Sequence, residues 1–287
     1  MSATLPGGAA PDRYAVIGNP VAHSKSPAIH AIFARETAQS LVYERLLAPL
    51  DAFEASVAAF VAAGGRGLNV TLPFKLEAFA LATRRSPRAE AAGAVNTLRV
   101  EADGALYGDN TDGIGLVRDI EGTCGTAIAG ARILLLGAGG AARGAVLPLL
   151  ERRPATLVIA NRTAERAQTL VERFASAAAQ AACVLHGGDA RVASSTAFDI
   201  VVNATSGSLS GALPCDFTVA PGALAYDMMY AAEPTVFMRQ AASQGARTAD
   251  GLGMLIEQAA ESFRVWRGVL PPTVSARRAL RAPSQPE

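Results

Sequence analysis

The sequence predicts an α/β protein of two domains, the second of them a doubly wound parallel sheet. Its 287 residues suffice for two domains of about 150 residues each. Short β-rich runs alternate with longer helical patterns, which is typical of βαβ units and parallel sheet. Hydrophobic residues make up 50% and charged residues 18%. This composition can fill two cores, and it excludes intrinsic disorder for the body of the chain.

Charge and cysteine content exclude several classes of partner. The 26 Lys and Arg nearly balance the 25 Asp and Glu, so no long-range field for nucleic acid or an anionic membrane is expected. The three cysteines are widely spaced without a C-x-x-C, which supports neither a disulfide framework nor a zinc site. Residues 1–11 lack the basic region of a signal peptide, and Arg143 and Pro148 interrupt the most apolar window, 133–150. We therefore expect a cytoplasmic protein without a metal, nucleic-acid or membrane partner.

The alternating pattern places the elements as follows. Strands are expected at 14–18, 41–47, 67–72, 94–100, 104–108, 132–136, 156–160, 182–185, 199–203, 224–227 and 246–249. Helices are expected at 27–38, 51–63, 113–120, 140–152, 164–179, 234–243 and 252–267. The glycine-rich stretch 121–131 precedes a fresh strand, so we place the change of domain near the start of helix 113–120. The helices after Asp250 are expected to return to the first domain.

A glycine-rich turn follows strand 132–136 and leads into a helical pattern. It reads Gly137-Ala138-Gly139-Gly140-Ala141-Ala142. Gly137 permits a tight turn, Gly139 lets a pyrophosphate approach the backbone, and the small Ala142 lets helix and strand pack closely. The N–H groups at the start of the helix can then bind phosphate. In this strand–turn–helix context the motif predicts a dinucleotide site in a Rossmann domain, rather than a glycine turn between two buried elements.

The end of the next strand predicts which dinucleotide binds. An NAD site usually has Asp or Glu there, whereas this chain has Asn161-Arg162-Thr163, with Arg166 one helical turn on. Two guanidinium groups on one side of a helix can flank a 2′-phosphate, so NADP is favoured. The alternative is that Thr163 only caps the helix and both arginines are solvated.

Polar residues in the first half of the chain stand at the ends of predicted elements. Asn69 and Thr71 lie two apart in GLNVTLPFK (67–75), so they share a strand face, and Lys75 follows the strand end. Ligands bind at that edge of open α/β sheets. From the local pattern alone, a solvated surface lysine is the preferred interpretation of Lys75.

Two further segments carry polar groups beside predicted helix starts. Ser26 before Pro27 is typical of an N-cap, whereas Ser24 is unexplained by capping, and two hydroxyls at a helix N-terminus could hold a carboxylate. Asp112, in GDNTDG (108–113), could be only a cap. Asn96 adds another amide to the polar residues that gather in this half of the chain.

Taken together, these segments resemble the shikimate 5-dehydrogenase family. They occur in the same order as in that family and extend over nearly the whole chain. The segments that carry the resemblance are YAVIGNPVAHSKSP (14–27), GLNVTLPFK (67–75), AGAVNT (92–97), GDNTDG (108–113), LLGAGGAARG (135–144), NRTAER (161–166), NATSGS (203–208), YDMMY (226–230) and DGLGMLIEQAA (250–260).

The resemblance implies NADPH-dependent, reversible reduction of 3-dehydroshikimate to shikimate, a step of aromatic amino acid and chorismate biosynthesis. It implies a substrate domain of residues 1–111 with 251–287, an NADP domain of residues 112–250, and a monomer or homodimer that binds a small-molecule substrate. The catalytic pair implied is Lys75 with Asp112. The implied substrate ligands are Ser24, Ser26 and Tyr230 for the carboxylate, and Asn69, Thr71, Asn96, Asp112 and Gln258 for ring hydroxyls. The implied cofactor contacts are Gly137, Ala138, Gly139, Gly140, Ala141, Asn161, Arg162, Thr163, Arg166, Met228 and Gly251.

Three other functions remain open at this stage. A quinate dehydrogenase that uses NAD is the nearest, although the paired serines favour a substrate without the extra ring hydroxyl. A non-catalytic binding module on the same fold would not need both Lys75 and Asp112. A folate or amino acid dehydrogenase of related architecture leaves Ser24 and Ser26 unexplained.

Overall fold

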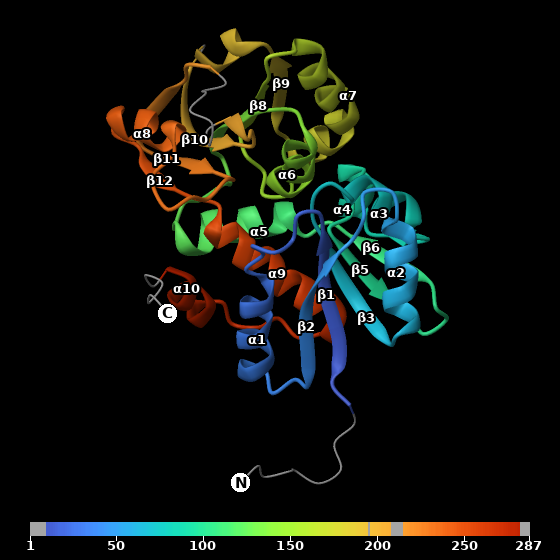
Figure 1. The fold of residues 1–287 in the computed structure, drawn as a ribbon. Coiled ribbons are helices and arrows are strands. Elements are labelled where there is room, and N and C mark those ends of the chain that lie inside the picture. The colour runs from blue at the N-terminus through green and yellow to red at the C-terminus, as the bar shows by residue number, and fades with distance from the viewer. Residues whose placement is uncertain (1–9, 195, 208–214, 282–287) are drawn as a thin grey trace. The chain divides into compact units, whose positions relative to one another are not determined.

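The computed structural model describes residues 10–194, 196–207 and 215–281 (Figure 1). These residues form two compact units. Unit 1 holds the described residues up to Arg85, the segment Val95–Asp109 and the residues from Ser262 onward, and unit 2 holds Ser86–Ala94 and Asn110–Glu261. Both units combine helices with a sheet, so the predicted α/β class is confirmed. Within the described ranges, no helix has the length and apolar character needed to cross a membrane.

Unit 1 is built on a mixed sheet of six strands in the order β2-β1-β3-β5-β6-β4. Strands β1, β2 and β3 are mutually parallel, whereas β5 runs antiparallel to both β3 and β6. The strands are β1 Asp12–Gly18, β2 Leu41–Leu47, β3 Gly65–Val70, β4 Arg84–Arg85, β5 Thr97–Val100 and β6 Leu106–Asp109. The helices are α1 Ser26–Glu36, α2 Phe53–Ala62, α3 Lys75–Leu81, α10 Val274–Arg281 and the end of α9, which spans Leu252–Arg267.

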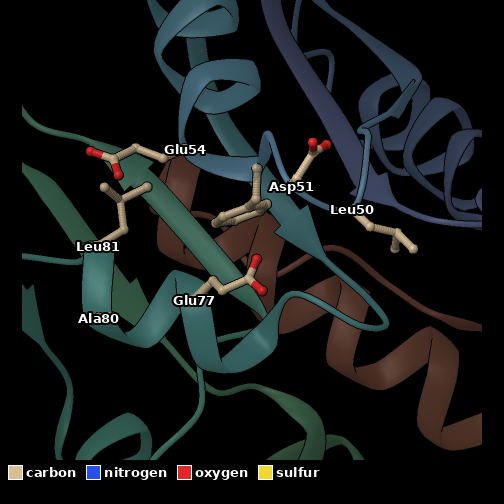
Figure 2. Close-up of a pocket in the computed structure, with 7 residues that line it drawn as sticks. Leu50, Asp51, Glu54, Glu77, Ala80 and Leu81 are labelled. Atoms are coloured by element: carbon tan, nitrogen blue, oxygen red, sulfur yellow. The ribbon is translucent and has the colours of Figure 1, made fainter.

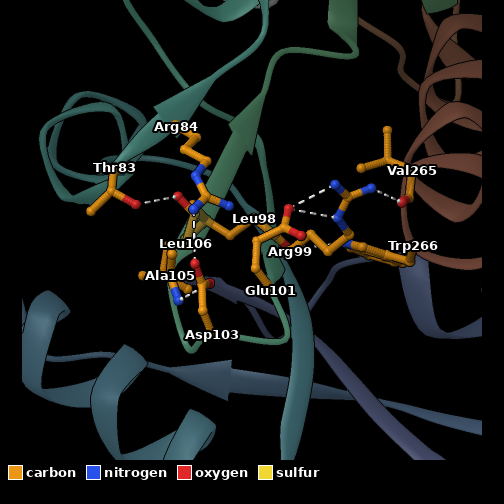
Figure 3. Close-up of polar contacts among 10 residues, drawn as sticks. All are labelled: Thr83, Arg84, Leu98, Arg99, Glu101, Asp103, Ala105, Leu106, Val265 and Trp266. Atoms are coloured by element: carbon orange, nitrogen blue, oxygen red, sulfur yellow. Dashed lines mark hydrogen bonds and ion pairs between the residues drawn. The ribbon is translucent and has the colours of Figure 1, made fainter.

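The end of α9 is fastened to the β5 backbone, as Figure 3 shows. The Trp266 indole N–H donates to the Leu98 carbonyl at 2.9 Å, and the Arg99 guanidinium donates to the Val265 carbonyl at 2.8 Å. The indole also explains why Gly67 on β3 has no side chain, since a Cβ there would lie 2.5 Å from Trp266 Nε1. Two residues close together on the helix thus fix its end against the sheet of unit 1.

Unit 2 contains a parallel sheet of six strands in the order β12-β11-β10-β7-β8-β9. The order reverses between β7 and β10, as in a Rossmann domain, so the doubly wound sheet is confirmed. The strands are β7 Arg132–Leu136, β8 Thr156–Ala160, β9 Val184–Gly188, β10 Ala197–Asn203, β11 Thr218–Asp227 and β12 Arg247–Ala249. The helices are α4 Pro87–Ala92, α5 Asp112–Arg118, the π-helix η1 Asp119–Thr123, α6 Gly140–Leu150, α7 Ala164–Ala181, the 3-10 helix η2 Ala190–Ser194, α8 Val236–Ser243 and most of α9.

The central strand β7 shows why this sheet needs helices on both faces. Its alternate residues point to opposite sides. Ile133 and Leu135 belong to the core that includes residues of α6 and α7, whereas Leu134 and Leu136 belong to a second core with Phe237 of α8. All four strand residues are fully buried. An uninterrupted apolar run is therefore what a central parallel strand requires.

A buried ion cluster joins three helices of unit 2. The Glu261 carboxylate on α9 is inaccessible to solvent, and its two oxygens accept from Arg88 of α4 at 2.9 Å and Arg118 of α5 at 2.8 Å. A lone buried carboxylate would be strongly unfavourable, so two charged partners stabilise it here. The cluster accounts for the inclusion of α4 in unit 2 although its sequence neighbours belong to unit 1.

The structure contains short elements that the sequence pattern did not predict. These are the helices α3, α4, η2 and α10 and the two-residue strand β4. Helices α3 and α4 have seven and six residues, which is under two turns and too short to show a helical period. The expected helix α9 contains the boundary between the units, and the unpredicted α10 belongs to unit 1.

His30 of α1 is buried within an aromatic cluster of unit 1. Its ring stacks on Tyr43 with centroids 4.2 Å apart, and the rings of Phe33, Phe263 and Trp266 also pack against it. Within the described part of the chain, neither ring nitrogen has a hydrogen bond partner. Burial lowers the pKa of His30 to about 3, so the imidazole is neutral in the folded protein at physiological pH.

This environment predicts a loss of stability in mild acid. Since the pKa of His30 is lower in the folded than in the unfolded chain, the unfolded state takes up the proton first as pH falls below about 6.5. Each pH unit from there towards 3 then costs about 1.4 kcal/mol. Urea unfolding between pH 7 and 4.5 should show a shallower loss for His30→Phe than for the wild type. The exposed His186 provides the control, His186→Phe, and equal slopes in all three proteins would contradict the prediction.

Candidate active site

The polar residues that follow β3 lie close to the adjoining turn of β1. Strand β3 ends at Val70, so Thr71 stands just beyond it, and its N–H donates to the Ile17 carbonyl at 3.0 Å. Gly18 makes room for this residue, since a Cβ there would lie 2.3 Å from Thr71 Cγ2. Lys75 is half-buried at the first position of α3, and its carbonyl accepts from the Val95 N–H at 2.9 Å. The backbone of Lys75 is thus tied to the segment that leads to Asn96.

The two serines lie at the start of α1, but not as the sequence pattern predicted. Ser26 is the first residue of the helix and Lys25 is its N-cap, so the interpretation of Ser26 as the N-cap is wrong. Instead the Ser24 hydroxyl accepts from the Ser26 N–H at 3.3 Å, while its carbonyl accepts from Arg45 at 2.7 Å. No side chain caps α1. The Ser26 N–H is thus already used and Pro27 has none, so the start of the helix offers chiefly two hydroxyls, which could bind a carboxylate.

Asn69 and Asn96 are joined by hydrogen bonds inside unit 1. Asn69 is 6% and Asn96 is 3% exposed. The Asn69 amide donates to the Asn96 carbonyl at 3.3 Å and accepts from the Tyr43 hydroxyl at 2.7 Å. Burial raises the pKa of Tyr43 well above 10, an effect that a hydrogen bond with Ser26 partly offsets. Tyr43 is therefore neutral and donates its proton, which ties the two predicted amides and a predicted serine into one cluster.

Unit 2 contains the remaining predicted substrate residues. Asp112 is the first residue of α5, where a negative charge is favourable for the helix dipole, and its N–H donates to Asn110 Oδ1 at 3.2 Å. Gln258 of α9 accepts from the Thr111 hydroxyl at 3.3 Å. Tyr230 is 38% exposed beyond β11, and partial burial raises its pKa. Gln258 and the start of α5 thus lie together within unit 2.

The glycine turn after β7 has the open backbone that the sequence predicts for a pyrophosphate site. Gly137 has φ +105°, and its N–H donates to the Ala160 carbonyl at 2.8 Å. Gly139 and Gly140 are exposed, and a Cβ on either would meet no atom within 4 Å. No side chain caps α6, which begins at Gly140. Its first N–H groups are therefore suited to phosphate, and the residues fit a dinucleotide.

The arginines predicted to bind a 2′-phosphate are exposed at the end of β8. Neither Arg162 nor Arg166 forms an ion pair or side-chain hydrogen bond with the residues that the structure describes. Thr163 is the N-cap of α7, but its side chain accepts no capping hydrogen bond. Asn161 instead donates to the Thr163 carbonyl at 2.9 Å. This arrangement fits a phosphate between two solvated guanidinium groups, and capping does not explain Thr163.

The last two predicted cofactor residues are in close backbone contact. The Met228 carbonyl lies 2.2 Å from the position that a Cβ on Gly251 would occupy, so this glycine permits the approach. The Gly251 N–H also donates to the Met229 carbonyl at 3.0 Å. The segment before α9 is thereby attached to the end of β11, beside the site where the sheet order reverses.

A buried network that the sequence analysis missed joins the ends of β10 and β11. The Asp227 carboxylate is fully buried and accepts from Asn203 Nδ2 at 3.0 Å, the Met229 N–H at 3.1 Å and the Thr235 hydroxyl at 2.6 Å. Asn203 in turn accepts from the Thr205 hydroxyl at 2.7 Å. Polar residues at the carboxyl ends of two apolar strands were the available signal. The segment 203–208 ends at Ser208, which lies outside the described residues.

The predicted residues thus fall into one group in each unit. Unit 1 holds Ser24, Ser26, Asn69, Thr71, Lys75 and Asn96. Unit 2 holds Asp112, Tyr230, Gln258 and every predicted cofactor residue.

A pocket in unit 1 lies apart from these residues. It is formed by α2, α3 and the segment before α2, and Figure 2 shows its lining of Leu50, Asp51, Phe53, Glu54, Glu77, Ala80 and Leu81. This lining holds three carboxylates and no Lys or Arg, which does not suit the anionic substrate predicted for this chain. None of the predicted substrate residues lines it.

Comparison with known proteins identifies the family. Over its full length the chain is 58% identical to the shikimate dehydrogenase (NADP(+)) of Cupriavidus necator, of which it covers 99%. The chain belongs to the shikimate dehydrogenase family. Family models for the shikimate dehydrogenase substrate binding domain, shikimate/quinate 5-dehydrogenase and the shikimate 5'-dehydrogenase C-terminal domain match residues 16–98, 121–210 and 251–281. The predicted family is confirmed.

Other shikimate dehydrogenases support the same assignment. The NADP(+) enzyme of a Janthinobacterium strain is 59% identical over 94% of this chain and 97% of its own. The structure of the Thermus thermophilus shikimate 5-dehydrogenase in complex with NADP(H) and shikimate has a TM-score of 0.82 and 34% identity, covering 94% of this chain and 98% of that one.

Proposed function

We propose that this member of the shikimate dehydrogenase family catalyses the reversible reduction of 3-dehydroshikimate to shikimate with NADPH. The observation that carries the proposal is the full-length similarity to shikimate dehydrogenases named for NADP(+). The residues fit this function, since an uncapped helix with two serines suits the substrate carboxylate, and the open glycine turn suits a dinucleotide. A non-catalytic module would need neither Lys75 nor Asp112.

We assign the cofactor to unit 2. Gly137, Ala138, Gly139, Gly140 and Ala141 would hold the pyrophosphate through backbone N–H groups at the start of α6. Asn161, Arg162, Thr163 and Arg166 would hold the adenosine end, because the exposed guanidinium groups suit the 2′-phosphate that distinguishes NADP from NAD. Met228 and Gly251 would line the nicotinamide end.

The proposed chemistry assigns Lys75 and Asp112 to proton transfer. When bound, NADPH supplies the hydride that reduces the ketone carbon. Negative charge then develops on the ketone oxygen, and the Lys75 ammonium would stabilise that charge and donate the proton. Asp112 would orient the amine and favour its charged form. Ser24, Ser26 and Tyr230 would bind the substrate carboxylate, and Asn69, Thr71, Asn96 and Gln258 would bind the ring hydroxyls.

The remaining assignments are part of the same proposal. We assign residues 1–111 with 251–287 to the substrate domain and residues 112–250 to the NADP domain. The small-molecule substrate is shikimate or 3-dehydroshikimate, the compartment is the cytoplasm, and the oligomeric state is monomer or homodimer.

An absorbance assay at the nicotinamide band tests the proposal. Purified protein should reduce NADP⁺ with shikimate, and should be much less active with quinate and NAD⁺. No turnover with any of the four substrate and cofactor combinations would refute an enzymatic function. Turnover faster with quinate and NAD⁺ would instead support the quinate dehydrogenase alternative.

A further inference from the structure

Two buried hydroxyl groups join the predicted substrate amides in unit 1. Thr97 on β5 and Ser262 on α9 are both fully buried, and their hydroxyl oxygens lie 2.8 Å apart. The Asn69 amide nitrogen donates to Ser262 Oγ at 2.9 Å and to Thr97 Oγ1 at 3.2 Å. Thr97 Oγ1 also donates to Asn96 Oδ1 at 2.9 Å. Thr97 ends the AGAVNT segment (92–97), but the sequence predicted no role for either hydroxyl.

The number of protons fixes the direction of each hydrogen bond. A hydroxyl has one hydrogen. Since Thr97 uses its own towards Asn96 Oδ1, the 2.8 Å contact with Ser262 requires Ser262 to donate. Ser262 Oγ is then an acceptor for Asn69. This orientation of the two hydroxyls is consistent with the contacts between Thr97, Ser262, Asn69 and Asn96 Oδ1.

The two amides are oriented consistently with these directions. The Asn69 NH2 group points to the two hydroxyls, and its oxygen points to the Tyr43 hydroxyl at 2.7 Å. A carbonyl oxygen has two lone pairs, so Asn69 can still accept one further hydrogen bond. The Asn96 oxygen points to Thr97, which turns the NH2 edge of that amide away from the hydroxyl pair. Rotating the Asn69 amide would place its oxygen against the Asn96 carbonyl, to which its NH2 group now donates at 3.3 Å.

We propose that Thr97 and Ser262 are positioning residues that fix which atoms Asn69 and Asn96 present to the substrate. Asn69 Oδ1, which accepts from Tyr43, then keeps a second lone pair for a ring hydroxyl. This inference rests on the proposed function, because it assumes that the two amides bind substrate hydroxyls. Loss of either positioning hydroxyl removes at least two hydrogen bonds from this buried cluster, which loosens the amides that it holds.

A matched pair of substitutions at Thr97 separates positioning from packing. Thr97→Val keeps the shape and removes the hydroxyl, whereas Thr97→Ser keeps the hydroxyl and removes a methyl group. We expect Thr97→Val to raise KM for shikimate roughly 5- to 100-fold, with KM for NADP⁺ unchanged, and Thr97→Ser to remain near the wild type. Equal effects of the two substitutions, or a larger effect of Thr97→Ser, would overturn the proposal.

Ser262→Ala tests the same idea from a different element. If Ser262 acts through Asn69, its effect on KM should largely disappear in an Asn69→Ala background, where no amide remains to be positioned. An effect of equal size in both backgrounds would overturn the proposal. Ser56→Ala, which removes a helix hydroxyl bonded to the Ala52 carbonyl, is the control and should leave both KM values unchanged. A wild-type protein that does not turn over shikimate would instead refute the proposed function and this inference together.

Discussion

Replacing Lys75 by alanine is expected to lower kcat by about 10²–10⁴-fold, with little change in KM for shikimate. The proposed role of its ammonium is to stabilise and protonate an oxygen that becomes negative only during reduction, so the transition state loses more than the bound substrate does. Steady-state kinetics in both directions measures the effect. An unchanged kcat would remove Lys75 from the reaction.

Two further variants make the Lys75 result specific. Lys75→Arg retains a positive charge but holds its proton far more tightly, so it should also keep KM near the wild type and should not recover kcat. Glu77→Gln changes an exposed residue of the same helix and should leave kcat unchanged. If Lys75→Arg recovered the full kcat, charge stabilisation alone would account for the role, and proton donation would be excluded.

Removing Arg162 and Arg166 together is expected to raise KM for NADP⁺ roughly 10- to 100-fold while leaving the weak activity with NAD⁺ nearly constant. A hydrogen bond to a charged group contributes about 1.5–3 kcal/mol, and solvent exposure of both side chains reduces that value. Initial rates with each cofactor give the ratio of the two kcat/KM values.

A substitution of an exposed arginine in unit 1 is the control for the comparison of NADP⁺ with NAD⁺. Arg278→Ala removes an exposed charge from α10 in unit 1, so it should alter neither KM. Loss of NADP⁺ and NAD⁺ activity in the same proportion in the double variant would contradict the prediction. The two arginines would then stabilise the fold of unit 2 and would not recognise the 2′-phosphate.

The alternation of apolar runs and helical patterns along the sequence predicted the strands of both sheets. It did not predict the short helices and the short strand. The apolar runs at 132–136, 156–160 and 199–203 are buried on both faces, so their composition alone identifies central parallel strands. Helix α3 was hidden because its seven residues directly follow the strand pattern of β3. Helix α4 has local signals, since the Ser86 side chain accepts from the Ala89 N–H at its start and Gly93 ends it, but its six residues are too few to show a helical period. Its ion pair between Arg88 and Glu261, 173 residues apart, has no local pattern.

Sequence analysis found the site residues that lie in recognisable motifs. It missed those whose role depends on tertiary contacts. Lys75, Asp112 and the glycine turn stand in segments whose order identifies the family. Ser262 acquires its neighbours only through folding, since Asn69 and Thr97 are 193 and 165 residues distant in the chain. Ser26 was misjudged as an N-cap because a Ser-Pro pair predicts a helix start only to within a residue.

The buried Asp227 network has a consequence for the energetics of ligand binding. Its carboxylate accepts from three donors on the segments that follow β10 and β11, so Asn203, Met229 and Thr235 are held together by folding alone. A dinucleotide that docks beside them would not have to immobilise these stretches of backbone, and a preorganised wall of this kind leaves more of the interaction energy for affinity.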